Sequence, residues 1–251
     1  MTLLIDAGIT FLKWARLEGE AVGASQTVVH HGVEPSEWQR ALAAVVPPPR
    51  RVLVANVAGQ QFAQRLSDCV RATWGVEAEF PVASRSAYGL TNAHAEPHSL
   101  GIDRWLGMVA AWHSARVPLL CVSVGTAFTI DLIDAAGAHR GGCIMPGARL
   151  MRESLHAQTS GVAAAALLDL PVVDGSFAIN TAGAVQQGAR LALAAFTDRA
   201  AVALETAATR PARVFLTGGA APQVAALMNH PVEQVPDLVL RGLALLHGAP
   251  A

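Results

Sequence analysis

The sequence of 251 residues predicts an α/β protein built from two similar domains. Short apolar segments typical of strands alternate with longer segments of helical spacing, which is the pattern of layered α/β folds. A strand, a turn that contains glycine and threonine, and a second strand begin at Leu4, and the same pattern begins again at Val122. This internal duplication predicts one domain over residues 1–116 and another over residues 117–251, joined without a flexible linker.

The first domain is predicted to begin with a β-hairpin. Two strand-like segments, at 3–5 and 11–15, flank the residues Asp6, Ala7 and Gly8. Segments of helical spacing then alternate with a short buried strand, and the three prolines at 47–49 end the first helix. The expected order is a helix at 34–46, a strand at 51–56, a helix at 60–74 and a helix at 102–115.

The second domain is predicted to contain three strands in succession, followed by helices. Pro146 and Gly147 begin a helical region, and the longest helical pattern of the chain comes after it. A last strand ends at a pair of glycines. The expected elements are strands at 119–124, 127–133 and 139–145, a helix at 181–208, a strand at 213–217 and a helix from about residue 222.

Charge and composition exclude several classes of partner. The formal net charge is −1, and the arginines are scattered, so no surface for nucleic acid is predicted. No uninterrupted apolar run reaches the roughly 18 residues that a membrane span needs. The three widely spaced cysteines form no metal-binding pattern and fit a reducing compartment. We therefore expect a cytoplasmic protein without nucleic-acid or membrane partners, with His30 and His31 on its surface.

The turn after the first strand is the first candidate site. Its glycine would let backbone N–H groups approach a phosphate, and a carboxylate at the strand end, Asp6, could hold hydrated Mg²⁺. Thr10 and Lys13 would supply a hydroxyl and an ammonium to the same phosphates. Lys13 is the sole lysine of the chain. An ordinary hairpin turn explains the segment equally simply, because Asp-x-Gly is a common turn signal.

Two further glycine turns follow strands in the second domain. Gly125 and Thr126 repeat the logic of the first turn, and Gly218 and Gly219 could let an adenine or ribose pack against backbone before a helix. Each turn alone is better explained as a plain connection between elements. The order of the three turns resembles the phosphate, phosphate and adenosine segments of the actin-like ATPase superfamily.

Asp103 and Arg104 form the fourth candidate. A carboxylate at a helix start can accept a proton from a substrate hydroxyl that attacks a γ-phosphate. The neighbouring guanidinium can bind a carboxylate or a phosphoryl group through two parallel hydrogen bonds. An N-capping aspartate beside a surface arginine is the alternative, and the residue types alone leave it open.

Taken together, the motifs resemble the type III pantothenate kinase family. They span nearly the whole chain, and their combination is more specific than any one of them. They are DxGxTxxK at 6–13, GxDR at 101–104, GTAxTxD at 125–131, GGxIxPG at 141–147, NTxxAxxxG at 180–188 and LTGG at 216–219. The resemblance implies two ribonuclease-H-like (actin-like ATPase) domains around a nucleotide cleft.

The resemblance also implies roles for individual residues. Asp103 would be the catalytic base on the pantothenate hydroxyl, and Asp6 would hold Mg²⁺ through the phosphates. The implied ATP-binding residues are Asp6, Ala7, Gly8, Ile9, Thr10, Phe11, Leu12, Lys13 and Thr126. The implied pantothenate-binding residues are His94, Gly101, Ile102, Asp103, Arg104 and, from a partner subunit, Thr181.

Three positions depart from the family pattern. Ile9 stands where the family usually has asparagine, and His94 aligns with a tyrosine that contacts substrate. Ser123 replaces an aspartate that serves the family as a ligand for K⁺ or NH₄⁺. The departures leave Asp6, Lys13 and Asp103 in place but make the monovalent-cation site and the contact at His94 doubtful.

The expected function is ATP-dependent phosphorylation of pantothenate to 4′-phosphopantothenate, the first step of coenzyme A synthesis. The expected cofactors are Mg²⁺ and a monovalent cation, and the expected assembly is a homodimer. Two alternatives remain at this stage. One is a regulatory protein that kept the fold, because related proteins have been described as a Bvg accessory factor linked to transcription. The other is a related kinase that acts on a sugar or another small alcohol.

Overall fold

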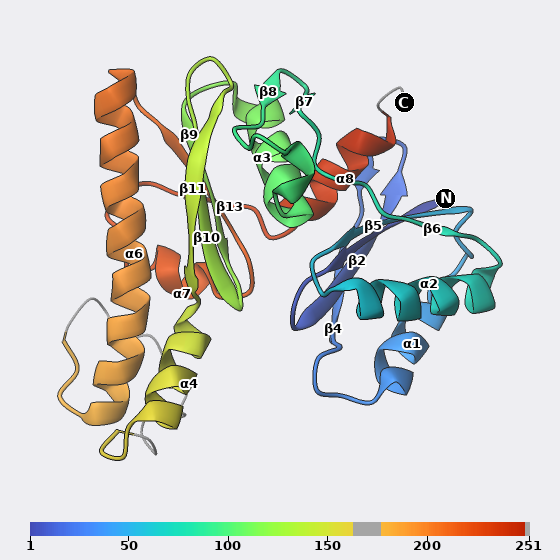
Figure 1. The fold of residues 1–251 in the computed structure, drawn as a ribbon, viewed down its shortest axis with the longest axis horizontal. Coiled ribbons are helices and arrows are strands. Elements are labelled where there is room, and N and C mark those ends of the chain that lie inside the picture. The colour runs from blue at the N-terminus through green and yellow to red at the C-terminus, as the bar shows by residue number, and fades with distance from the viewer. Residues whose placement is uncertain (163–176, 249–251) are drawn as a thin grey trace. The chain divides into compact units, whose positions relative to one another are not determined.

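The computed structural model describes residues 1–162 and 177–248 (Figure 1). Within them the chain forms two compact units. Unit 1 contains Met1–Ala110 and the segment from Asp237 onward, and unit 2 contains Ala111–Pro236. Both units have a mixed sheet with helices, so the predicted α/β class is confirmed.

Unit 1 is built on a sheet of order β3-β2-β1-β5-β6, with β4 also paired to β2. The first hairpin is antiparallel, whereas β5 and β6 continue the sheet in parallel. The strands are β1 (Thr2–Ala7), β2 (Phe11–Glu18), β3 (Ala21–Val22), β4 (Gln26–Val29), β5 (Arg51–Asn56) and β6 (Ala78–Glu79). A separate small pair, β7 (Ser86–Ala87) and β8 (Leu90–Thr91), precedes the short 3₁₀ helix η1 (Pro97–Ser99).

Helices α1 (Pro35–Ala43) and α2 (Gln60–Trp74) cover one face of this sheet (Figure 1). Apolar residues at helical spacing on α2, Phe62, Leu66 and Val70, pack with Leu3 and Ile5 of β1. Because strand side chains alternate between faces, Leu4 is buried on the other side of β1. The carboxyl end of the central strand is therefore held rigidly from both faces.

The last helix, α8 (Leu238–His247), belongs to unit 1 and packs on β1 and β5. Leu238, Leu240 and Leu243 bury its apolar side. At Gly242 a Cβ atom would lie 2.3 Å from the carbonyl oxygen of Leu106, on helix α3 (Ile102–Ala115), so only glycine allows this approach.

The expected domain ranges, 1–116 and 117–251, therefore differ from the observed units. Unit 2 begins at Ala111, inside α3, and the chain returns to unit 1 at Asp237. The expected helix from about residue 222 is the short α7 (Ala221–Ala225), and the longer helix begins only at Leu238. The apolar side of α8 is buried against strands that are distant in the sequence, and this burial places α8 in unit 1. The local spacing of apolar residues could not predict that placement.

Unit 2 repeats the sheet pattern with the order β11-β10-β9-β12-β13. Its strands are β9 (Leu119–Val124), β10 (Ala127–Ile133), β11 (His139–Pro146), β12 (Arg213–Thr217) and β13 (Glu233–Gln234). Its other helices are α4 (Ala148–Gln158) and α6 (Thr181–Ala208). The positions of β9, β10 and β12 and the bounds of α6 match the sequence-based expectation.

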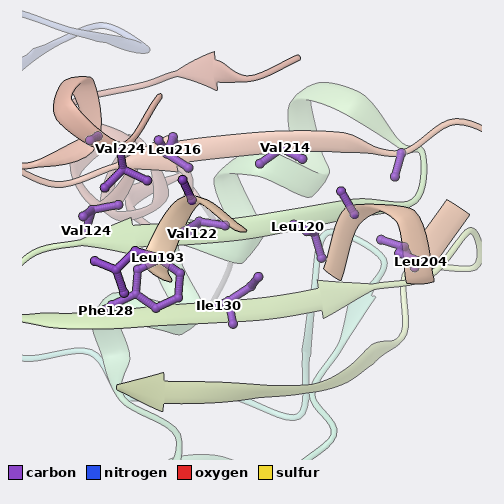
Figure 2. Packing of buried hydrophobic residues seen from close by; sticks show 14 residues of the cluster. Leu120, Val122, Val124, Phe128, Ile130, Leu193, Leu204, Val214, Leu216 and Val224 are labelled. Carbon is purple, nitrogen blue, oxygen red and sulfur yellow. The ribbon is translucent and has the colours of Figure 1, made fainter. Parts of the chain in front are cut away.

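The core of unit 2 lies between α6 and the sheet. Figure 2 shows Leu193 of α6 beside Val122 and Phe128 of the sheet, and Leu204 of α6 at the other end of the cluster. Other labelled members of this cluster are Leu120, Val124, Ile130, Val214, Leu216 and Val224. Each Å² of apolar surface removed from water stabilises the fold by roughly 25 cal/mol, so this cluster is the main stabilising contribution in the unit. The core fixes the ends of β9 and β12, where the second and third glycine turns lie.

Candidate functional site

The first turn, residues Gly8–Thr10, connects β1 and β2 at the edge where β1 ends. Asp6 and Lys13 face each other across the hairpin, and the Gly8 amide donates to the Phe11 carbonyl oxygen at 3.0 Å. Ile9 and Phe11 are 47% and 50% exposed. The turn is therefore tight at its base and open at its tip, as a phosphate-binding turn requires.

The carboxyl group of Asp6 has a strongly raised pKa. Burial, followed by repulsion from the Asp103 carboxylate, raises its pKa from 3.8 to about 7. The Lys13 ammonium acts in the opposite direction, and Asp237 raises the pKa further. Because Lys13 and Asp103 both act on the pKa of Asp6, the three groups lie near one another, although Asp6 and Asp103 are 97 positions apart in the chain.

Asp237 is a member of this group that the sequence analysis missed. Its Oδ1 lies 3.6 Å from the Lys13 Nζ. Asp237 occupies the N-cap position of α8, yet its side chain makes no capping hydrogen bond there. An aspartate before an apolar helical segment is a cap signal, so its sequence context suggested structure rather than chemistry.

Asp103 lies in the first turn of α3. The helix begins at Ile102, so Asp103 follows the cap position, and its Oδ1 accepts from the Arg104 amide at 2.8 Å. A Cβ atom at Gly101 would lie 2.8 Å from the same oxygen. Asp103 and Arg104 are both half-buried, which does not fit a simple cap beside a surface arginine. Gly101 therefore leaves room for this carboxylate.

His94 lies in a well-ordered loop of unit 1. Its Nδ1 is 3.0 Å from the Ser99 hydroxyl, and its amide donates to the buried Asn92 side chain at 2.9 Å. Arg85 donates to the His94 carbonyl oxygen at 2.7 Å. The loop is fixed by these contacts, and a role of His94 toward pantothenate stays a prediction.

The second and third glycine turns meet at the end of β9 in unit 2. A Cβ atom at Gly147 would lie 2.1 Å from the Gly125 carbonyl oxygen, and the Gly147 amide donates to Thr126 at 2.9 Å. Gly218 has a φ of +97°, and a Cβ atom there would lie 2.4 Å from the Val124 carbonyl oxygen. Three separated motifs thus form one backbone cluster, which gives a physical reason for their glycines.

Ser123 is half-buried near this cluster. Its cross-strand neighbours are Thr129 on β10 and Thr217 on β12. Asp131, two residues further along β10, is buried and bonded to His139 Nε2 at 2.9 Å. The sequence motif included Asp131, but His139 was missed because it lies on β11 without a distinctive local pattern. Thr181 is exposed at the start of α6.

His30 was expected on the surface, and this expectation is wrong. It is half-buried, and its Nε2 lies 2.6 Å from the Gly8 carbonyl oxygen in the first turn. His31 is exposed as expected.

No helix in the described ranges 1–162 and 177–248 has the length and apolar character to span a bilayer.

The donor set in unit 1 suits a divalent cation shared with phosphates. No group of three or more potential metal ligands occurs among the described residues. Mg²⁺ does not need such a cage, because it keeps several waters and uses one or two carboxylates plus phosphate oxygens. The repulsion that raises the pKa of Asp6 is the kind that a cation relieves, so Asp6 fits this role.

Comparison with known proteins follows from this arrangement. Solved structures share this fold at low sequence identity, and the charged cluster at the end of β1 suits a phosphotransferase. A proposed 2-dehydro-3-deoxygalactonokinase from Sinorhizobium meliloti superposes with a TM-score of 0.58 at 16% identity, covering 97% of both chains. A proposed Baf family transcriptional activator from Campylobacter jejuni superposes at 0.57 with 20% identity, covering 96% of this chain and 94% of that one. At these identities the likeness shows the fold alone.

Sequence relatives identify the family. The type III pantothenate kinase model matches residues 2–203, so the chain belongs to that family. The type III pantothenate kinase of Nitrosococcus oceani is 36% identical over 97% of this chain and 92% of its own length. That of Aromatoleum aromaticum is 36% identical over 98% and 97%. The resemblance inferred from the motifs is confirmed.

The pKa of Asp6 predicts a pH-dependent stability. Because its folded-state pKa of about 7 exceeds the unfolded value of 3.8, the folded protein binds more protons between about pH 4 and 7. The contribution of Asp6 therefore decreases as pH rises through this window. Without nucleotide or Mg²⁺, Asp6→Asn should unfold at a higher temperature than wild type at pH 8. Its free energy of unfolding should be larger by about 2 kcal/mol after discounting solvent screening. At pH 5 the advantage of the variant should be clearly smaller, because only the first part of the window between pH 4 and 7 has been crossed.

The control for this measurement is Asp68→Asn, which changes an exposed carboxylate on α2. Its effect should be small at both pH values. An Asp6→Asn effect that is the same at pH 5 and pH 8 would contradict the raised pKa.

Proposed function

We propose that this chain transfers the γ-phosphoryl group of ATP to the hydroxyl of pantothenate and forms 4′-phosphopantothenate. The observation that carries the proposal is the grouping of Asp6, Lys13 and Asp103 in unit 1, on motifs shared with the family to which the chain belongs. The same motifs argue against the regulatory alternative, since a binding surface alone has no need of this grouping. The GxDR motif argues against a sugar as acceptor.

The residues of unit 1 divide the work of phosphoryl transfer, which depends chiefly on positioning and electrostatics. Asp103 accepts the proton of the attacking hydroxyl, and Gly101 gives its carboxylate the room to do so. Lys13 holds a nucleotide phosphate, and Asp237 fixes the Lys13 ammonium from the other side. Bound Mg²⁺ would neutralise phosphate charge beside Asp6. Arg104 binds the pantothenate carboxylate.

The first turn of unit 1 and the Gly125 turn of unit 2 are each proposed to bind a phosphate group through the backbone. The Ile9 amide at the tip of the first turn would serve one phosphate group, and Thr126 another. Ile102 and His94 would line the pantothenate site. We place the reaction in the cytoplasm, where the three free cysteines would stay reduced.

The activity is tested by coupling ADP release to an optical signal with and without pantothenate. ADP should appear only when pantothenate is present. Release that pantothenate does not change would contradict the proposed function. In the same assay, Asp103→Asn should lower turnover by about 10²-fold or more, the usual scale for loss of a general base.

The control variant is again Asp68→Asn, whose turnover should equal that of wild type. Folding of Asp103→Asn is checked by its circular dichroism and melting temperature. A folded Asp103→Asn enzyme with near-normal turnover would reject Asp103 as the base.

We further propose a two-fold homodimer in which Thr181 reaches the pantothenate site of the partner. Thr181 begins α6, whose N-cap Asn180 accepts from the Gly183 amide at 2.9 Å. Phe177 and Ile179, just before it, are 90% and 100% exposed, which favours an apolar contact with another subunit. Sedimentation at micromolar concentration should show a dimer. A fully active monomer would contradict the proposal.

The cation site gives the last prediction of this section. Ser123 and its neighbours Thr129 and Thr217 offer neutral hydroxyls, and Asp131 is bonded to His139. A bare monovalent cation is therefore held more weakly than beside an aspartate. Turnover with Mg²⁺ and ATP should be nearly flat when KCl replaces choline chloride at constant ionic strength, and Ser123→Asp should create a dependence on K⁺. Strong K⁺ dependence of the wild type would show the idea to be wrong.

A further inference from the structure

His30 contacts both ends of the first turn. It follows β4, and its Nε2 lies 2.6 Å from the Gly8 carbonyl oxygen. Its backbone amide donates to the Thr10 carbonyl oxygen at 3.0 Å. His30, which is distant from the turn in the sequence, thus forms hydrogen bonds with the carbonyl oxygens of Gly8 and Thr10, the two residues that flank Ile9.

These bonds set the direction of the peptide groups in the turn. A carbonyl oxygen in a trans peptide points opposite to the N–H group of the same peptide. Because the Gly8 carbonyl points to His30, the Ile9 amide points away from it. The Thr10 carbonyl is likewise turned toward β4, which keeps its negative dipole end from a phosphate at the turn.

The imidazole is itself held in place by packing. Its ring centroid lies 4.1 Å from that of Phe62, a buried residue of α2 that also contacts Trp38 at 5.4 Å. Burial lowers the pKa of His30 and outweighs the hydrogen bond to the Gly8 carbonyl, which acts in the opposite direction; His31 and Arg65 add smaller lowering contributions, so the neutral ring is favoured. A neutral ring can donate to a carbonyl oxygen only from the nitrogen that carries hydrogen, here Nε2.

The space beside the turn is open. A cavity of about 350 Å³ lies there. It is lined by Ile9, His30, His31, Gly32, Val33, Val57, Ala58, Phe62 and Arg65. The turn therefore borders a hollow on the His30 side rather than a packed layer. Loss of the imidazole would remove support that adjacent side chains do not supply.

We propose that His30 is a positioning residue for nucleotide phosphate, because its side chain holds the Gly8–Ile9 peptide with the Ile9 amide directed toward the phosphate. The inference rests on the proposed function of the first turn. His30 contacts neither substrate nor cofactor in this account and acts through the backbone of Gly8. It follows that the donor at Nε2, and not the ring as such, is the required feature.

The experiment separates the donor from the packing. His30→Leu keeps apolar contact with Phe62 but removes the donor, whereas His30→Gln keeps an N–H donor of similar reach. His31→Leu makes the same change at the exposed neighbouring histidine. Binding of Mg²⁺ with a non-hydrolysable ATP analogue is measured by calorimetry without pantothenate, and melting temperatures are recorded alongside.

His30→Leu should weaken nucleotide binding about tenfold, the scale of one well-placed hydrogen bond. His30→Gln should stay within about threefold of wild type, His31→Leu should match wild type, and the KM for pantothenate should change little in all three. Equal binding by His30→Leu and His31→Leu would overturn the inference, as would equal losses in His30→Leu and His30→Gln.

These outcomes are independent of the proposed function as a whole. Wild-type ADP release with and without pantothenate tests the reaction, and the variant series tests the turn through nucleotide binding alone. A wild type that ignores pantothenate but still shows the ordered loss of binding would overturn the reaction and leave the role of His30 standing.

Discussion

Burial of the Asp6 carboxyl beside two other carboxylates is the constraint on which the candidate site in unit 1 depends. Asp6 lies at the end of the central strand β1, where burial and the charges of Asp103 and Asp237 hold its pKa near 7. Asp103 lies in the first turn of α3, and Asp237 precedes α8. Lys13 partly offsets the repulsion.

This arrangement is poised for a cation and a polyphosphate, and unit 2 is arranged differently. Unit 1 uses charged side chains fixed by a sheet and helices, as electrostatic stabilisation of phosphoryl transfer requires. Unit 2 brings Gly147 against the Gly125 carbonyl oxygen and Gly218 against that of Val124, and at Gly147 and Gly218 a Cβ atom would not fit. Unit 1 thus gathers charged side chains and unit 2 gathers closely approaching backbone segments, although both repeat the same strand order in their sheets.

Local pattern predicted the parts of the fold and site that depend on local physics. The hairpin, β5 and α6 follow from apolar spacing, and Asp6, Lys13 and Asp103 follow from motifs beside glycines. Asp237, His30 and His139 were missed because their roles arise from tertiary contacts with residues far away in the sequence. Asp237 resembled a helix cap, and His30 lies in a polar connection that resembled an exposed loop.

The acidity of Asp6 links these observations, and one titration measures it directly. The protein is labelled with ¹³C at the aspartate carboxyl groups, and the Asp6 signal is assigned by its absence from Asp6→Asn. In the absence of nucleotide and Mg²⁺, the carboxyl shift should change with a midpoint of about pH 7. A midpoint near the ordinary value of 3.8 would mean that Asp6 is neither buried nor opposed by Asp103 and Asp237 as described, and would contradict the account.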